Sequence, residues 1–199
     1  VKSFSYNYAL STAQRTANTT FNFNEISNSV LSSGEWFRFY VEKSGVYKIS
    51  RSFLQSLGMN VGSIDPRNLK IYGGGGRMLP LLNSEFYPDD LQENAITVIG
   101  ENDGSFHSED YILFYAEGVD NWNTESQTNI NLYSTKSYYY ITSGGNEGKR
   151  ISNLIQPTGI TTLELNTFDD YQFHEVDLVN IGRLGRRWFG EEFSFINQR

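Results

Sequence analysis

The sequence predicts an all-β, sandwich-like domain that is mostly antiparallel, with one short helix near residues 50–57. Three observations indicate this class. Aromatic residues are abundant, with 13 Tyr, 14 Phe and 3 Trp among 199 residues, and such side chains favour strands. Apolar and polar residues alternate in several short runs, as in strands with one buried face. Turn-forming residues recur every ~8–12 positions, which is the spacing typical of a sandwich.

The N-terminal part is expected to consist of strands. Residues 4–10 and 21–23 alternate aromatic and polar side chains. Residues 35–41 alternate as well, with Trp36, Arg38 and Tyr40 on one face and Phe37, Phe39 and Val41 on the other, and one of these faces is expected to be buried. The turn residues Ser44-Gly45 and a second apolar run at 46–49 follow, so we expect a β-hairpin formed by these two runs.

A single helix is expected over residues 50–57. Ser50 or Ser52 supplies the N-cap oxygen, and Gly58 stands at the C′ position where helices commonly end. The apolar side of this helix consists of Phe53, Leu54 and Leu57.

Further strands are expected at four places: residues 69–72, 95–99, 111–116 and 138–142. Residues 79–82 are apolar but contain Pro80, which favours an irregular or edge segment. Residues 160–165 alternate Thr with apolar residues, and residues 168–178 fit a strand or a helix. We place a domain boundary near residues 134–136. It separates an N-terminal β domain, 1–135, from a second β segment, 136–199.

Charge and residue usage exclude several function classes. The formal net charge is −7 and the pI is about 4.9, which disfavours binding of nucleic acid. Residues 78–135 hold the acidic residues Glu85, Asp89, Asp90, Glu93, Glu101, Asp103, Glu109, Asp110, Glu117, Asp120 and Glu125, and no Lys or Arg. We interpret them as a solvated acidic face rather than a cation site. Cysteine is absent, which excludes disulfides and thiol chemistry within this chain. No run approaches the ~20 apolar residues of a membrane helix.

Metal and cofactor sites are not expected. Oxygen ligands cluster at residues 101–110, which raises the question of calcium. The spacing differs from that of an EF-hand, and Asn102, Asp103 and Gly104 are also ordinary turn residues, so we favour a strand-to-strand turn. The two histidines, His107 and His174, stand far apart in the sequence.

The motifs that could carry catalysis or phosphate binding are incomplete. The chain has no Gly-x-Ser-x-Gly elbow. Adjacent carboxylates on a strand point to opposite faces, which makes them poor acid–base pairs. The adjacent pairs are Asp89-Asp90, Asp169-Asp170 and Glu191-Glu192. The glycines 73–76 follow a predicted strand, but no helix start follows them, so we interpret them as a turn. No catalytic residue is therefore assigned.

A basic, aromatic stretch near the C-terminus is the candidate docking site. Arg186, Arg187 and Trp188 lie between two glycines. Arginine pairs bidentately with carboxylates and stacks on Trp, which suits an interface. Ordinary surface exposure explains the same pattern equally well.

An ordered series of stretches is similar to the N-terminal region of PorU-type sortases of the type IX secretion system, which are gingipain-like cysteine peptidases on the surface of Bacteroidota. The matching stretches are Gly34–Phe39, Ser44–Ile49, Leu57-Gly58, Asp65–Gly73, Glu93–Ile96, Gly104–Phe106, Asp110–Gly118, Glu175, Asn180 and Gly185–Glu191. Together they cover most of the chain.

The resemblance implies a longer protein with a cysteine-peptidase-like domain downstream. That protein would be a transpeptidase that removes the C-terminal sorting signals of secreted cargo proteins and attaches the cargo to anionic lipopolysaccharide. It would act at the cell surface, associated with the outer membrane of a Gram-negative bacterium, together with the outer-membrane barrel PorV. Since its nucleophile would be Cys, the present segment is expected to be a non-catalytic, propeptide-like β region. Its role would be to scaffold, shield or dock against the remainder of the same protein.

Two other function classes stay open. A carbohydrate-binding module of a surface polysaccharide-degrading system would use exposed Trp and Tyr, although core packing is the more frequent fate of such residues. A glycoside hydrolase would require two suitably spaced carboxylates. The oligomeric state and the point at which the chain was cut from its parent are left open.

Overall fold

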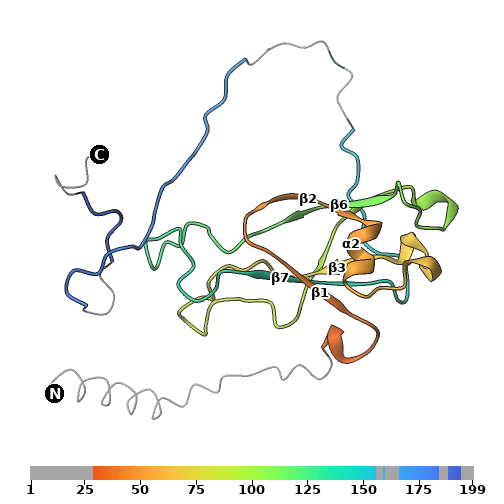
Figure 1. Cartoon of the computed structure of the whole chain (residues 1–199), viewed down its shortest axis with the longest axis horizontal. Coiled ribbons are helices and arrows are strands. Elements are labelled where there is room, and N and C mark those ends of the chain that lie inside the picture. Colours follow the sequence, from red (N-terminus) through yellow and green to blue (C-terminus); the bar gives the residue numbers. More distant parts are fainter. Residues whose placement is uncertain (1–28, 156–158, 160–165, 184–187, 194–199) are drawn as a thin grey trace.

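The computed structural model describes residues 29–155, 159, 166–183 and 188–193, and these residues form two antiparallel sheets (Figure 1). The strand order is β1-β7-β3-β4 in the four-stranded sheet and β2-β6-β5 in the three-stranded sheet. Buried residues of both sheets join in one hydrophobic core. The predicted all-β, sandwich-like fold with one short helix is thereby confirmed.

The elements have the following bounds. The four-stranded sheet consists of β1 (Phe37–Val41), β7 (Ser137–Thr142), β3 (Lys70–Tyr72) and β4 (Glu93–Asn94). The three-stranded sheet consists of β2 (Gly45–Ser50), β6 (Tyr111–Ala116) and β5 (Thr97–Ile99). The helices are η1 (Val30–Ser32), α2 (Arg51–Ser56), η2 (Val61–Ser63), η3 (Pro66–Asn68) and η4 (Glu101–Asp103), of which only α2 is an α-helix.

The predicted hairpin of residues 35–41 with 46–49 is wrong. β1 pairs with β7 in one sheet, whereas β2 pairs with β6 in the other. The chain crosses between the sheets at residues 42–44, where the Ser44 hydroxyl accepts a 2.9 Å hydrogen bond from the Gly118 amide. A hairpin and a crossover between two sheets give the same sequence pattern, namely two alternating runs joined by a Ser-Gly turn. The pattern is the same because each strand buries one face in the core in both arrangements.

The predicted strand pair of residues 95–99 and 111–116 is confirmed, since β5 and β6 are antiparallel neighbours. The helix prediction is confirmed as well. The Ser50 hydroxyl accepts a 3.3 Å hydrogen bond from the Phe53 amide. Gly58, with φ of 95°, ends α2 in a Schellman motif, in which its amide donates to Gln55 and the Met59 amide donates to Leu54.

An aromatic cluster fills the core between the sheets. Phe39 of β1 lies 5.8 Å from Phe114 of β6 and 5.9 Å from Tyr139 of β7, measured between ring centroids. The Tyr139 hydroxyl donates to the Glu117 carbonyl at 3.0 Å and accepts from the Glu117 amide at 2.8 Å. Burial raises the pKa of Tyr139. This side chain thus ties the two sheets together.

The remaining segments are irregular or lie outside the description. Residues 79–82 form neither strand nor helix, as expected from Pro80. Residues 168–178, predicted as strand or helix, form neither. The predicted strands at 4–10, 21–23 and 160–165 lie outside the described residues. The expected boundary near residue 135 falls just before β7, which lies between β1 and β3 in one sheet.

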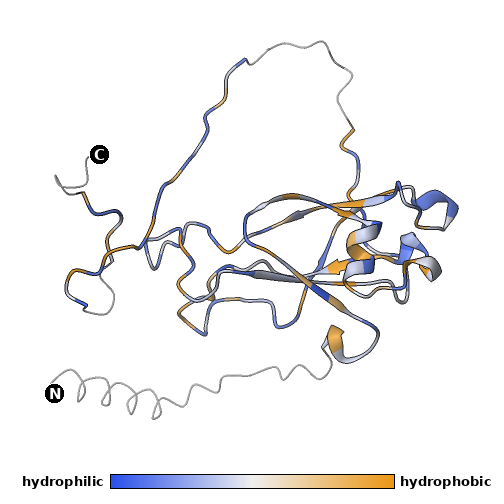
Figure 2. Ribbon diagram, in the orientation of Figure 1, coloured by the Kyte–Doolittle hydropathy of each residue, from blue (hydrophilic) through white to orange (hydrophobic). Residues whose placement is uncertain are grey.

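Two ends of the sandwich differ in character. The α2 end, defined as residues 51–69, 100–110 and 143–150, lies on the right of Figure 1. The open end, defined as residues 73–92 and 117–136, lies on the left. Figure 2 shows apolar stretches in the loops of the open end.

Candidate functional site

The predicted docking residues belong to a C-terminal segment that leaves the sandwich. Arg186 and Arg187 lie outside the described residues, so the structure does not test their role. Trp188 is described and is 49% exposed. Beside it, Phe189 exchanges hydrogen bonds of 2.8 and 3.0 Å with Val179 across a chain reversal. We call residues 166–183 and 188–193 the strap.

Glu175 anchors the strap to the open end. Its carboxylate accepts hydrogen bonds from the Thr128 hydroxyl and from the Asn129 amide, the latter at 2.8 Å. The Asn129 side chain donates a further bond of 3.2 Å. Partial burial alone would raise the pKa of Glu175, but these hydrogen bonds outweigh it and the pKa is lowered. The carboxylate is therefore held charged at neutral pH.

Sequence reasoning assigned no role to Glu175, although this residue belongs to the stretches that carry the family resemblance. Within the strap, His174 and Glu191 form a second contact, with 2.5 Å between the His174 Nε2 and a Glu191 oxygen. The hydrogen bond with His174 lowers the pKa of Glu191. Both side chains are exposed, so this contact organises the strap rather than the sandwich.

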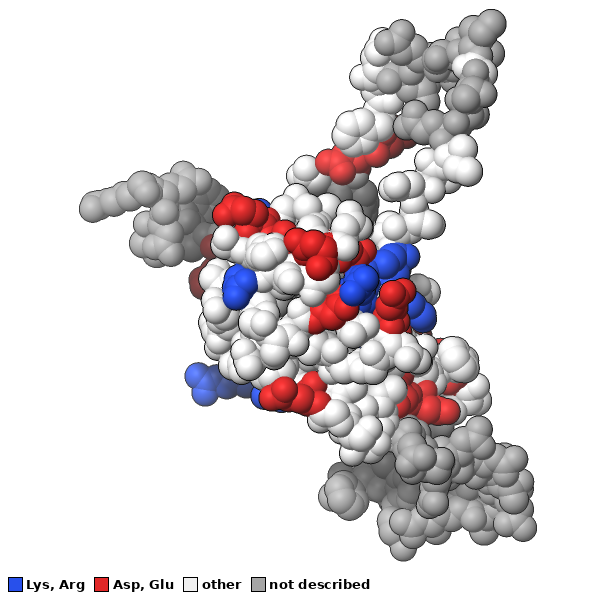
Figure 3. Space-filling view, turned by 90° about the vertical axis from the view of Figure 1, so that its right-hand side faces the viewer, with Lys and Arg blue, Asp and Glu red and all other residues white. Residues whose placement is uncertain are grey.

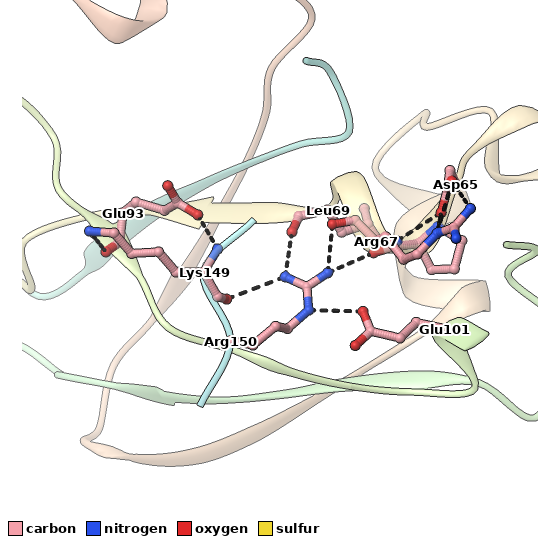
Figure 4. A network of polar contacts seen from close by, with 8 residues as sticks. Asp65, Arg67, Leu69, Glu93, Glu101, Lys149 and Arg150 are labelled. Carbon is pink, nitrogen blue, oxygen red and sulfur yellow. Dashed lines mark hydrogen bonds and ion pairs between the residues drawn. The ribbon is translucent and has the colours of Figure 1, made fainter. Parts of the chain in front are cut away.

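Arg150 closes the α2 end (Figure 4). Its guanidinium donates to Glu101 at 2.8 Å and to the carbonyls of Leu69, Pro66 and Arg67 at 3.2, 3.0 and 2.8 Å. The Arg150 and Glu101 side chains are each 25% exposed. The Arg150 side chain thus connects η3 and η4 to the residues that follow β7. No sequence motif indicated this role.

The same network contains a second ion pair. Asp65 caps η3 by accepting from the Arg67 amide at 3.0 Å, and its carboxylate also pairs with the Arg67 guanidinium at 2.6 Å. The hydrogen bonds from Arg67 lower the pKa of Asp65. Figure 3 views this end and shows some of its Lys and Arg side chains directly beside Asp and Glu.

The acidic segment 78–135 is neutralised in part by residues from elsewhere in the chain. Glu101 pairs with Arg150, and Glu117 pairs with Arg77 at 2.8 Å. The Glu93 carboxylate accepts from the Lys149 amide at 2.5 Å. These carboxylates are spread over both ends and have partners within the fold, so the segment is not simply a solvated acidic face.

Asp103 and Asp110, two carboxylates of residues 101–110, have structural partners. Asp103 accepts from the Ser105 amide at 3.0 Å and contacts His107 at 3.1 Å. Asp110 is buried and accepts from the His107 amide at 2.6 Å. Its side chain packs against Gly100, where a Cβ would lie 1.8 Å from an Asp110 oxygen. These contacts are those of a turn, as favoured from the sequence.

The other sequence candidates also have structural partners. A Cβ at Gly73 would lie 2.5 Å from the Tyr139 ring, so close packing explains this glycine. Asp90 accepts from the Val30 amide at 2.7 Å, which lowers its pKa. Across the described residues, no three His, Asp or Glu side chains gather as a metal site. No helix in the same residues is long and apolar enough to cross a bilayer.

The open end carries a hydrophobic groove. A surface cavity of about 420 Å³ is lined by Met78, Leu79, Leu81 and Tyr133, together with polar residues. Leu79 and Leu81 are 62% and 64% exposed. This groove offers apolar contact area and no reactive group, so its chemistry is that of a docking surface.

Exposed aromatic residues line the outer face of the four-stranded sheet. Tyr40 and Tyr138 are 48% and 42% exposed and lie opposite each other on β1 and β7. Lys136 lies 4.0 Å from the Tyr40 ring centroid, and Arg38 lies 4.8 Å from that of Tyr138. Trp36 is half-buried against Tyr72, with 5.2 Å between ring centroids.

Comparison with known proteins gives a partial similarity to a solved structure. No family model and no curated protein matches the chain. The fold is similar to part of the crystal structure of dimeric latent PorU from Porphyromonas gingivalis, with 27% sequence identity and a TM-score of 0.44. The match covers 64% of the present chain and 11% of the PorU chain. The chain thus resembles one region of PorU and spans a small part of its length.

Proposed function

We propose that this chain is the non-catalytic N-terminal β region of a cell-surface sortase of the PorU type. The observation that carries the proposal is the ordered series of family-like stretches between residues 34 and 191. Those stretches include residues that shape the structure, such as Gly58 at the end of α2, Asp65 at the cap of η3 and Glu175 at the strap anchor. A resemblance at such positions is a resemblance in fold as well as in sequence.

In this proposal the segment performs no chemistry. Cysteine is absent from the whole sequence, and the carboxylates and histidines described above are engaged in structural contacts. The peptidase-like domain that follows would process the C-terminal signals of secreted cargo at the outer membrane and work with PorV. The present region would dock against that domain through the strap, with Arg186, Arg187 and Trp188 at the contact.

The first experiment is to incubate the purified 199-residue segment with a peptide carrying a cargo C-terminal sorting signal. We expect no turnover, because the nucleophile would lie downstream. The full-length protein and its active-site Cys→Ala variant serve as positive and negative controls. Specific cleavage or transfer by the segment alone would refute the proposal.

The docking role is tested with Arg186→Glu and Arg187→Glu together in the full-length protein. We expect faster proteolysis near residue 199, because two reversed charges weaken an arginine-mediated contact. Arg38→Glu combined with Lys136→Glu on the outer sheet face is the charge-matched control. An unchanged cutting rate in the double arginine variant would make these arginines ordinary surface charge.

Carbohydrate binding is the second candidate, and the exposed pair Tyr40 and Tyr138 favours it. Aromatic faces beside cationic side chains suit stacking on sugar rings and hydrogen bonding to hydroxyls. Titration of surface polysaccharides against the wild type and Tyr138→Ala would test it. Binding that the substitution weakens at least tenfold would replace the first proposal, whereas absence of binding removes this candidate.

A further inference from the structure

The two ends of the sandwich differ in how much apolar surface they expose. At the open end, large apolar side chains with more than half of their surface exposed are Leu79, Leu81, Leu82, Phe86, Trp122, Leu132 and Tyr133. At the α2 end, the single exposed large apolar residue among the described residues is Phe53, at 37%. Three of the seven, Leu79, Leu81 and Tyr133, line one groove, and exposed apolar side chains that gather in this way mark an interaction site in proteins.

The groove at the open end is held in shape by a buried asparagine. The Asn131 side-chain nitrogen donates to the Gly76 carbonyl at 2.5 Å, and its oxygen accepts from the Tyr133 and Ser134 amides. The Asn131 amide in turn donates to Asp120. Both walls of the groove are therefore fixed relative to each other before any partner binds, which reduces the entropy cost of binding.

The strap contacts the sandwich at this same end. Glu175 is bound by Thr128 and Asn129, which lie three and two residues before Asn131 of the groove wall. The strap itself presents Leu178, Ile181 and Trp188, which are 64%, 79% and 49% exposed. The dark blue C-terminal part of the strap lies on the left of Figure 1, on the same side as the open end.

We propose that the groove of Met78, Leu79, Leu81 and Tyr133, together with the strap, is the docking surface for the peptidase-like domain of the same polypeptide. This inference rests on the proposed function, which supplies that domain. A domain tethered to the strap is present at the open end at a millimolar effective concentration, so even a modest apolar contact is occupied. The α2 end, where charges are paired internally, stays free of the domain.

Hydrogen exchange of the full-length protein tests this surface. Within the described part of the chain, the amides of Leu79, Leu82 and Phe86 donate no hydrogen bond, so they exchange quickly unless a partner covers them. We expect exchange over residues 78–87 to be slowed about tenfold or more in the full-length protein. Leu79→Asp with Leu81→Asp should abolish that protection.

The matched control is Val46→Asp with Tyr115→Asp, two exposed positions on the outer face of the three-stranded sheet. This control should keep the protection over residues 78–87. Free exchange of these residues in a full-length protein that does contain a peptidase-like domain would overturn the docking surface and leave the proposed function intact. A full-length sequence without such a domain would overturn both.

Two further outcomes identify other occupants and thereby overturn the inference. Protection that rises with protein concentration, together with a dimer in sedimentation analysis, would assign the groove to a second copy of the chain. Protection that appears only when a cargo protein is added would assign it to that protein.

Discussion

The α2 end and the open end are built from loops of the same two sheets, yet they stabilise the molecule in different ways. At the α2 end, Arg150 binds Glu101 and the backbone carbonyls of Pro66, Arg67, Leu69 and Lys149, and the apolar side chains of Leu54 and Leu69 are fully buried. At the open end, the loops leave leucine, phenylalanine and tyrosine side chains in solvent. Hydrophobic stabilisation scales with the area removed from water, so only the first arrangement contributes fully to the stability of the chain itself.

The difference indicates which end serves the fold and which serves a contact. The α2 end, with its buried leucines and its Arg150 network, is stabilised by contacts within the chain itself. At the open end, Asn131 fixes the walls of the groove and Glu175 holds the strap beside them. The exposed apolar side chains of this end are removed from water only when a partner covers them. Three substitutions test this division, each with a matched change at the other end or on the same segment.

The largest effect is expected from truncation of a buried side chain at the α2 end. Leu54→Ala should lower the free energy of unfolding by about 2–5 kcal/mol, because Leu54 is fully buried and leaves a cavity. The same change at the open end, Leu81→Ala, should stay within about 0.5 kcal/mol. Urea denaturation measures both. Equal losses would show that the open end carries core packing and would remove the contrast.

A second test removes one arginine from each end. Arg150→Ala should cost about 1.5–3 kcal/mol, because it leaves Glu101 and the carbonyls of η3 without their charged donor. Arg77→Ala breaks only the exposed pair with Glu117 and should cost about 0–1 kcal/mol. Thermal or urea unfolding reports the difference. A cost for Arg77→Ala that matches or exceeds that of Arg150→Ala would reverse the roles given to the two ends.

The smallest global effect is expected at the strap anchor. Glu175→Gln replaces a carboxylate that accepts from Thr128 and Asn129, so the strap should detach while the melting temperature stays nearly constant. Trypsin should then cut after Arg183 several-fold faster than in the wild type. Glu192→Gln, on the same strap, is the control. Equal cutting in both variants would mean that Glu175 does not hold the strap.

The same anchor makes the strap sensitive to acid. The folded-state pKa of Glu175 lies below its ordinary value, so its contribution is complete above the ordinary glutamate pKa of about 4.3 and is lost as the pH falls through the folded-state pKa. The protection of residues 176–183 against hydrogen exchange, relative to the free-peptide rate at the same pH, should therefore fall in acid before the sheets unfold. Glu175→Gln should show no such pH step.

Local patterns in the sequence were sufficient for most elements. Strands at 69–72, 95–99, 111–116 and 138–142 were predicted because one buried face imposes a period of two on the residues. The helix at 51–56 was predicted because its caps, Ser50 and Gly58, act within a few residues. The hairpin prediction failed because the partner of β1 is β7, about 100 residues away, and no local signal encodes that choice.

The candidate site was harder to predict for the same reason. Arg150 binds backbone carbonyls of Pro66, Arg67 and Leu69, which any residue type would offer, so no spacing of side chains reveals the network. Glu175 binds Thr128 and Asn129 across a long stretch of chain. The acidic run of 78–135 is evident in the sequence, but its ion pairs with Arg150 and Arg77 and the hydrogen bond from the Lys149 backbone amide to Glu93 exist only after folding.

The sequence by itself determined what depends on neighbouring residues: the β class, the single capped helix, the lack of thiol chemistry and the order of family-like stretches. The tertiary structure alone decided which strands pair, which charges neutralise each other and which end of the sandwich keeps its apolar side chains in water. The physical reason is the sequence separation over which each interaction acts. Periodicity and capping act over a few residues, whereas strand pairing, ion pairing and burial join residues that only the folded chain brings together.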